Sequence, residues 1–126
     1  MPKSVPTGPG LAVSNRPFST VVEANGFVFV AGQIGDAPGS NGPVSGGMEA
    51  ETRAMLDNVG RVLRAVGLDF TDVVRCTVYI TDFDEFQTMN AVYRTYFPVD
   101  PPARATVEVT RLALGANIEI EVTAAR

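Results

Sequence analysis

Polar and apolar residues alternate in several short runs along the chain, and this period of two is typical of half-buried β-strands. Two of these runs flank Asn25-Gly26, a strong signal for a two-residue hairpin turn, because both turn positions need positive φ angles. The pattern predicts five strands, over residues 18–23, 27–31, 72–80, 103–110 and 118–124.

Two further stretches show the 3.6-residue periodicity of amphipathic helices, over residues 48–66 and 82–97. Gly67 is expected to end the first helix and Pro98 the second. The apolar stripe of the second helix contains one polar residue, Asn90. Since a buried amide needs partners, spacing alone favours a structural hydrogen bond or an interface contact over ligand binding.

The predicted order of elements is ββαβαββ, an α+β fold with both helices on one face of a mixed sheet. Residues 1–126 are expected to form one domain, with an irregular arm over residues 1–16 that contains a candidate edge strand at 11–14. The strands also carry apolar residues on their second face, which must therefore be covered. A second copy of the chain is the simplest cover.

The two-residue turn also fixes the register of the first two strands. In this register four residues beyond the turn share one face of the sheet, namely Phe18, Thr20, Ala31 and Gln33. Phe18 then lies opposite Gln33 and diagonal to Ala31.

Charge and composition exclude several classes of function. The net charge of −4 argues against a nucleic-acid partner, because phosphate binding needs concentrated Lys and Arg. The single cysteine, Cys76, excludes an internal disulfide and lies in an apolar run, where core packing is its expected role. No apolar run is long enough to span a membrane, and no signal-like segment follows Met1-Pro2-Lys3. These features predict a cytoplasmic protein.

The sequence contains no histidine. Ser-His and Cys-His catalytic pairs are therefore excluded, and zinc would lack its usual nitrogen ligand. Any catalysis must rest on carboxylates, arginine, hydroxyls, backbone groups and water, with no metal.

Arg104 opens a predicted strand just after the rigid Pro101-Pro102 pair, and it shares the polar face of that strand with Thr106 and Glu108. A guanidinium there presents a fixed fork of donors that suits a carboxylate ligand. The alternative is a surface arginine paired with a glutamate, and the residues by themselves favour that alternative.

Several short motifs resemble those of the Rid/YjgF family, the RidA-like enamine/imine deaminases. They follow the family's order within residues 17–126: Gly32-Gln33-Ile34, Leu56-Asp57-Asn58-Val59, Asp72-Val73-Val74, Thr77-Val78-Tyr79, Asn90-Ala91-Val92-Tyr93, Pro102-Ala103-Arg104 and Ile118-Glu119-Ile120-Glu121. Each motif is weak by itself, but together they are specific for the family and its fold.

The resemblance implies a chorismate-mutase-like fold and a homotrimer with pockets at the subunit clefts. It also implies hydrolysis of reactive 2-enamine/2-imine acids to 2-keto acids and ammonia, as in a 2-iminobutanoate/2-iminopropanoate deaminase, without a metal or organic cofactor. Arg104 would bind the substrate carboxylate, and Glu119, with a raised pKa, would orient water or transfer protons. Asn90 and the backbone around Gly32 would bind the rest of the substrate.

The chain departs from this family at three site positions. Where the deaminases usually carry tyrosine, serine and cysteine, this chain has Phe18, Ala31 and Thr106. Two hydroxyls are thereby lost from one patch, so anion binding is expected and efficient deamination of small imino acids is left open. The alternative is a non-catalytic trimer that senses a small carboxylate metabolite. The acidic charge and the lack of histidine argue against a ribonuclease or translation inhibitor.

One geometric expectation concerns the last two predicted strands. If residues 103–110 and 118–124 pair as a hairpin, Arg104 and Glu119 lie on the order of 13 Å apart along the sheet. A site that uses both residues would then need a second chain or strong curvature of the sheet.

Overall fold

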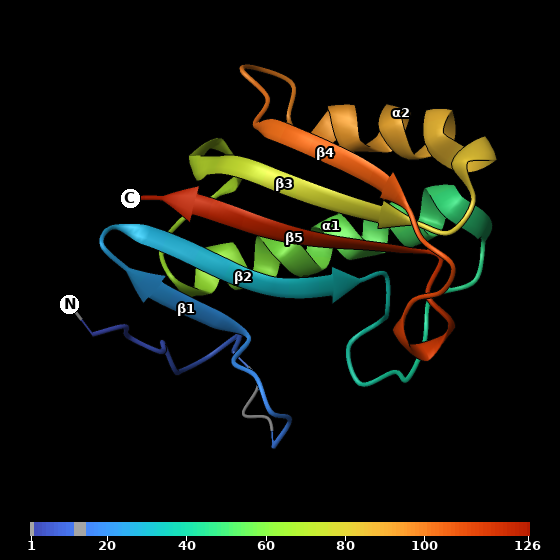
Figure 1. The fold of residues 1–126 in the computed structure, drawn as a ribbon. Helices are drawn as coiled ribbons and strands as arrows, with labels where there is room; N and C mark the ends of the chain where they lie inside the picture. The colour runs from blue at the N-terminus through green and yellow to red at the C-terminus, as the bar shows by residue number, and fades with distance from the viewer. Residues whose placement is uncertain (1, 12–14) are drawn as a thin grey trace.

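The computed structural model, which describes residues 2–11 and 15–126, contains a five-stranded sheet and two long helices in the predicted order (Figure 1). The strands are β1 (Val21–Ala24), β2 (Phe27–Ile34), β3 (Val73–Ile80), β4 (Ala103–Glu108) and β5 (Ile118–Ala125). The helices are α1 (Gly47–Ala65) and α2 (Phe86–Tyr96), and short 3-10 helices occupy Phe70–Asp72, Phe83–Glu85 and Ala113–Gly115. The predicted α+β fold with the order ββαβαββ is confirmed.

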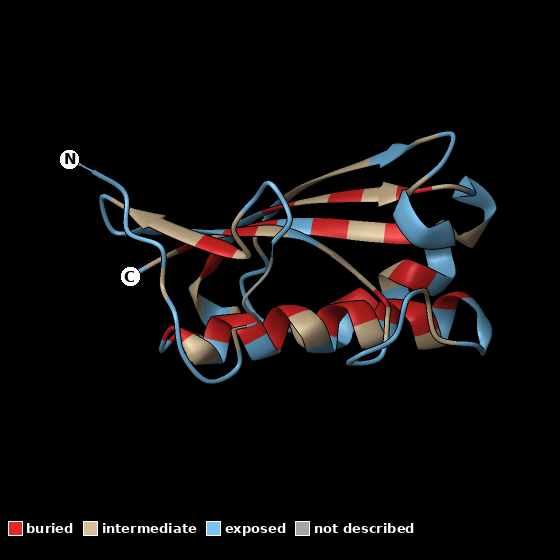
Figure 2. Ribbon diagram, turned by 90° about the horizontal axis from the view of Figure 1, so that it is seen from below, coloured by how far each residue is buried: buried red, intermediate tan, exposed pale blue. Residues whose placement is uncertain are grey.

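The strand order in the sheet is β1-β2-β5-β3-β4, and β3 and β4 form the parallel pair among antiparallel neighbours. A parallel pair needs a crossover connection, which α2 supplies between β3 and β4. Both helices lie behind the sheet in Figure 1 and below it in Figure 2, so they cover the same face. The predicted mixed sheet with helices on one face is confirmed.

The hydrophobic core lies between the helices and the sheet, where the buried segments of both layers face one another (Figure 2). β5 shows the cleanest alternation, because Ile118, Ile120, Val122 and Ala124 are all buried. α1 ends at Ala65, and Gly67 follows as the predicted stop, because its φ of 82° is left-handed and does not continue a helix. Burial of these apolar faces is the dominant favourable contribution to folding.

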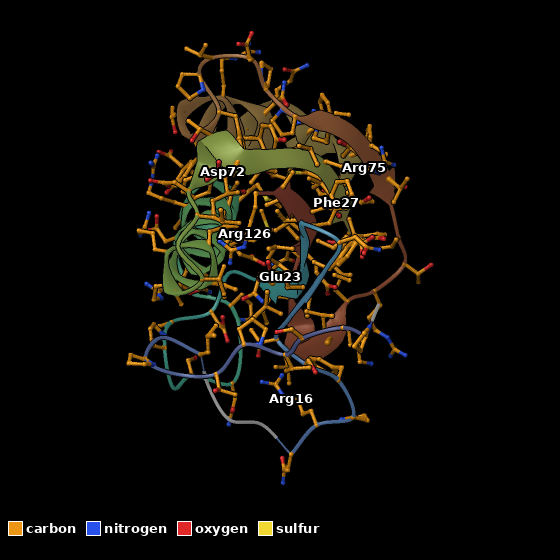
Figure 3. The ribbon with its side chains drawn as sticks, turned by 90° about the vertical axis from the view of Figure 1, so that its left-hand side faces the viewer. Arg16, Glu23, Phe27, Asp72, Arg75 and Arg126 are labelled. Atoms are coloured by element: carbon orange, nitrogen blue, oxygen red, sulfur yellow. The ribbon has the colours of Figure 1, made fainter. Side chains whose placement is uncertain are left out.

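The opposite face of the sheet is exposed in this chain and carries large apolar side chains. Phe27 and Phe29 on β2 are each 45% exposed, and Val107 on β4 is 40% exposed. Figure 3 shows Phe27 and Arg75 on the side of the sheet away from α1. The second face is therefore partly apolar, as the strand patterns predict.

The expected hairpin between the last two strands is wrong. β5 pairs with β2 and β3, so β3 separates it from β4. β4 follows Pro101-Pro102 and has no fully buried residue, which suits an edge strand. The four buried apolar side chains of β5 instead require a central position. The register assumed for Arg104 and Glu119 therefore does not occur.

The first hairpin forms at Asn25-Gly26 as predicted, and the Ala31 amide donates to the Thr20 carbonyl at 2.8 Å. However, β1 starts only at Val21, so the predicted pairing of Phe18 with Gln33 is wrong. The polar Ser19 and Thr20 do not extend the strand, and the β1 ladder ends before it reaches Phe18.

A β-bulge between Val30 and Gln33 changes the facing of β2. It sets Gln33 opposite the buried Ile120, whereas Ile34 lies opposite Glu119. Since paired residues point to the same side of a sheet, Gln33 turns toward the helices and away from the face of Ala31. The prediction that Gln33 shares that face is therefore wrong.

The described part of the N-terminal arm is irregular, with one isolated bridge from Ser4 to Glu23 on β1 and another between Gly8 and Leu11. The candidate edge strand at 11–14 falls largely on residues 12–14, which lie outside the described residues. Arg126 at the other end of the chain pairs with Glu23 (Figure 3) at 2.6 Å. None of the helices described could cross a membrane, because none is both long and apolar enough.

Candidate functional site

Arg104 is the second residue of β4 and faces the helix-covered side of the sheet. It pairs with the fully buried Cys76 of β3, and its guanidinium lies over two rings of α2. The Cζ atom is 4.5 Å from the centre of the Tyr93 ring and 5.7 Å from that of Phe86. No carboxylate in the described part of the chain forms an ion pair with Arg104. The alternative of a surface arginine paired with a glutamate is therefore wrong.

A cavity of about 420 Å³ opens beside Arg104 and the C-terminal end of α2. Its walls are Asn90, Tyr93, Arg94, Phe97, Pro98, Pro101, Pro102 and Arg104. The charged wall residues are both arginines, so the cavity favours an anion. Its volume lies within the range typical of small-molecule sites.

Asn90 lies at this cavity with Arg104, as the family resemblance implies. The structural hydrogen bond that spacing favours is not found, because the Asn90 side chain makes no hydrogen bond to any described group. Thr106 follows Arg104 on the same side of β4, opposite Val78, but does not line the cavity. We call Arg104, Asn90 and their cavity the arginine half-site.

Glu119 is the second residue of β5 and lies on the exposed face of the sheet, opposite Tyr79 of β3. Its carboxylate rests against Gly32 in the bulge of β2, where an added Cβ would come within 2.2 Å of Oε2. Gly32 therefore leaves room for this carboxylate. Burial raises the pKa of Glu119, and the negative charge of Glu121 raises it further. Both effects act in the expected direction.

A second cavity, of about 240 Å³, lies at the same bulge and takes Phe18, Ala31 and Gly32 into its wall. Thr20 and Gln33 also line it, so the predicted residues gather at one cavity despite the bulge. Phe18 is 53% exposed. We call Glu119, Gly32 and this cavity the glutamate half-site.

The long loop at residues 35–46 contributes to the rim of the second cavity through Asp36 and Pro38. Asn58 of α1 holds this loop, because its Nδ2 donates to the carbonyls of Ile34 and Asp36, both at 3.0 Å. The loop therefore forms part of the wall of this cavity.

Glu51 is a buried carboxylate that anchors the start of β5. It accepts hydrogen bonds from the Asn117 amide at 2.7 Å and from Asn117 Nδ2 at 2.8 Å. Glu51 is only 2% exposed, and these two donors satisfy a carboxylate that would otherwise be costly to bury. Through Asn117, α1 fixes the strand two residues before Glu119. Sequence reasoning did not single out Glu51. Its position on the apolar stripe of α1, four residues before Met55, could have indicated a buried carboxylate.

A single chain does not bring the two half-sites together. Arg104 faces the helices, whereas Glu119 faces the opposite side of the sheet. Through β3, Arg104 is level with Val122, three residues from Glu119. Two strand spacings and this offset separate the two Cα atoms by about 14 Å. The expected separation thus holds, although it arises from a different register.

Sequence reasoning missed the contact between Arg104 and the rings of Phe86 and Tyr93. Both rings belong to the apolar stripe of the second helix, a pattern that indicates core packing and not a platform for a cation. It also missed Asn58 and Arg61, which line the second cavity. Both lie on a face of α1 whose charged residues suggest exposure to solvent.

Cys76 is buried, and burial raises the pKa of its thiol, so it suits core packing as predicted and is a poor nucleophile. Across residues 2–11 and 15–126, no three His, Cys, Asp or Glu side chains form a group that could hold a metal ion.

Comparison with known proteins identifies the family. The family model described as Endoribonuclease L-PSP matches residues 11–126. Human 2-iminobutanoate/2-iminopropanoate deaminase is 43% identical over 108 residues, which are 86% of this chain and 79% of the human protein. A Rid-family protein from Yersinia pestis is 34% identical, with a TM-score of 0.91 over 99% of this chain and 100% of that one.

A crystal structure of E. coli TdcF with bound serine is 30% identical, with a TM-score of 0.87, and 98% of each chain is covered. A mouse relative is 40% identical and an Arabidopsis relative 41% identical, each over 86% of this chain and over 80% and 58% of the respective relative, and both carry deaminase names. These matches extend over nearly all of the elements that build the two half-sites. The chain therefore belongs to the endoribonuclease L-PSP family, the family of the Rid/YjgF proteins.

Proposed function

We propose that this protein hydrolyses reactive 2-enamine/2-imine carboxylic acids to 2-keto acids and ammonia, without a cofactor. The state of Arg104 carries this proposal. Arg104 is half-buried, and its guanidinium lies over two rings and pairs with no described carboxylate, so its donor fork is available to a ligand. The names of the human and mouse relatives support an imine as the reacting group.

The reaction needs little beyond positioning and proton transfer, because the imine carbon is already electrophilic. Arg104 binds the substrate carboxylate, and Asn90 and the backbone at Gly32 hold the remainder. Glu119 takes a proton from water as the water oxygen bonds to the imine carbon. Glu119 returns this proton to the nitrogen and then transfers the proton of the new hydroxyl to it, so that the C–N bond breaks, ammonia leaves with the bonding electron pair and the carbonyl forms. The raised pKa of Glu119 suits a group that both accepts and returns a proton.

The two half-sites must meet for this reaction, and we place their meeting at the subunit clefts of a homotrimer. Each pocket would combine the arginine half-site of one subunit with the glutamate half-site of its neighbour. The exposed apolar residues Phe27, Phe29 and Val107 support association through the open face of the sheet. Sedimentation at micromolar concentration should give a trimer, and a monomer would contradict this arrangement.

The test generates imines in the reaction mixture with an amino-acid oxidase and measures the rate of keto-acid release. The protein should accelerate release, and Arg104→Ala should abolish both the acceleration and the binding of small carboxylates without loss of folding. Arg104→Lys should rescue poorly, since an ammonium cannot reproduce the fork. Full activity in either variant would remove Arg104 from the site.

The second candidate is a trimer that binds a small carboxylate metabolite without catalysis. The apolar side chains of Phe18 and Ala31 in the wall of the second cavity favour it, and the E. coli relative was crystallised with bound serine. Carboxylate binding without acceleration of any imine would support this candidate. The ribonuclease in the family's name would require RNA binding with a steep salt dependence, which the net charge of −4 disfavours.

A further inference from the structure

We propose that Tyr93 and Phe86 are positioning residues, an aromatic cradle that aims the guanidinium of Arg104 at the carboxylate of a ligand. The guanidinium carbon lies 4.5 Å from the centre of the Tyr93 ring and 5.7 Å from that of Phe86. Both distances are within the range at which a cation is attracted to a ring face. This inference rests on the proposed function, because it assigns a role to Arg104 as the carboxylate anchor.

Aromatic rings can orient the guanidinium of an arginine without using its N–H donors. A carboxylate partner would also hold the guanidinium in place, but it would use the N–H donors and neutralise the charge that a substrate needs. A ring face attracts the flat side of the cation and leaves the donors in its plane available. This explains how Arg104 can be ordered and half-buried while no described carboxylate pairs with it.

The spacing along α2 assembles the cradle and the ligand contact on one helix face. Phe86, Asn90 and Tyr93 are separated by four and three residues, so they lie one above another. Asn90 thus lies between the two aromatic residues along this helix face and lines the cavity beside Arg104. A single element therefore sets the direction of the arginine and of the neighbouring amide.

The cradle is held by packing from behind. Tyr93 is 5% exposed, and its ring centre is 4.7 Å from that of Phe97. Phe97 in turn contacts Phe70 at 5.4 Å. Phe86 stacks on Phe83, with 5.2 Å between ring centres. These contacts limit ring motion, so the surface under the guanidinium is rigid.

Tyr93 contacts the guanidinium of Arg104 through its ring face, and the positive charge of Arg104 also acts on the nearby hydroxyl by lowering its pKa, which other effects outweigh. The hydroxyl is buried and has no hydrogen-bond partner among the described groups, so a ligand in the cavity cannot reach it. Burial and the neighbouring Cys76 thiol raise the pKa of Tyr93, so the hydroxyl stays protonated and adds no charge beside the arginine. Replacement by phenylalanine should therefore preserve the cradle.

The test measures calorimetric dissociation constants of the full-length protein for 2-oxobutanoate and for its uncharged methyl ester. Tyr93→Leu and Phe86→Leu should each weaken acid binding, by roughly tenfold for Tyr93→Leu, and leave ester binding unchanged. Tyr93→Phe should bind the acid within about twofold of the parent protein and raise Tm, because it removes a buried unpartnered hydroxyl. Turnover of an imine should show the same split, with a raised KM and a nearly constant kcat.

Tyr96→Leu is the matched control on the same helix. Its ring packs against Phe70 and its hydroxyl donates to Asp57, but it has no contact with Arg104. This variant should lower Tm without changing the preference for acid over ester. Should Tyr93→Leu fail to fold, Phe86→Leu decides the matter, because Phe86 is only partly buried.

Parent-like acid binding in both leucine variants would overturn the cradle, as would an equal loss of acid and ester binding. The proposed function would survive either result, provided that Arg104→Ala still loses acid binding and imine turnover. If Arg104→Ala binds the acid normally, the proposed function itself fails.

Discussion

The two half-sites differ in how much of their environment the chain itself supplies. Arg104 lies over two rings of α2, beside a cavity with rigid proline walls. Glu119 lies on an exposed sheet face next to another carboxylate, Glu121, and against the backbone of Gly32. The chain itself therefore holds the Arg104 guanidinium on both rings. It fixes the position of the Glu119 carboxylate but leaves it partly open to solvent on the exposed face.

This difference suggests a division of roles in the proposed reaction. An anchor works best when it is rigid before the ligand arrives, because little order then has to be imposed on binding. A proton-transfer group instead needs its final environment, including water exclusion, only when the pocket is complete. The arginine half-site should therefore govern KM, and the glutamate half-site should govern kcat.

The largest expected effect comes from mixing two inactive variants. Arg104→Ala and Glu119→Gln should each lose imine turnover, but each retains the half-site that the other lacks. After unfolding and joint refolding, mixed trimers should recover activity, with about one pocket in four holding both native residues. The measurement is keto-acid release before and after mixing.

Each variant refolded alone serves as the control and should stay inactive. Glu119→Gln should still bind 2-oxobutanoate, because its arginine half-site is intact. No recovery in mixed trimers of confirmed composition would mean that both residues act within one chain.

An intermediate effect is expected from the pair of carboxylates on β5. Glu121→Gln removes the negative charge that helps to raise the pKa of Glu119, so that pKa should fall. If Glu119 must be ionised to accept a proton, the acidic limb of kcat/KM should shift to lower pH, by less than about one unit. Gln keeps an acceptor oxygen for the Tyr79 hydroxyl, which now donates to Glu121 at 2.7 Å. A shift of the limb to higher pH would contradict this.

The same pKa shift has a consequence for stability. A carboxyl whose pKa is raised by folding binds its proton more tightly in the folded state than in the unfolded state. The unfolding free energy therefore decreases as pH rises from the ordinary glutamate value through the raised one. Glu119→Gln should accordingly have a higher Tm than the parent protein at neutral pH, together with its loss of turnover.

The smallest expected effect concerns the wall of the second cavity. Phe18 and Ala31 line this cavity at positions where the family resemblance implies a tyrosine and a serine. The apolar groups in place of these two hydroxyls should favour imines with larger apolar side chains. An apolar pocket gains only about 1–3 kcal/mol per methylene, so the preference should be shallow. Imines made from alanine, 2-aminobutyrate, leucine and phenylalanine provide the comparison.

The double variant Phe18→Tyr/Ala31→Ser restores the hydroxyls and should move the preference toward the alanine-derived imine. A parent protein that already prefers that imine would show that Phe18 and Ala31 do not set the selectivity.

The elements of the fold were predictable because their patterns are local. The helical periodicity located the first helix to within one residue and the second to within four, and Asn25-Gly26 located the turn of the first hairpin, although β1 starts three residues later than predicted. The partner of β4 was not predictable in this way, since an edge strand and a hairpin strand can carry the same alternation. Which strand lies beside it depends on the α2 crossover.

For the site, residue types and the family resemblance found Arg104, Asn90 and Glu119, but not what surrounds them. Phe86 and Tyr93 look like ordinary core residues until β4 is seen to lie over them. Glu51 was missed because its partner, Asn117, is distant in sequence. Contacts between distant segments carry this information, and periodicity does not.

The bulge in β2 acts as a phase shift in the strand. Before it, Val28 and Val30 point to the core, and after it the next inward residue is Gln33 instead of Gly32. A one-residue deletion here would restore a continuous alternation, with Gln33 still inward and Ile34 still opposite Glu119. The more regular strand would lose the space that receives the Glu119 carboxylate. This site therefore constrains the number of residues in β2 as well as the identity of Gly32.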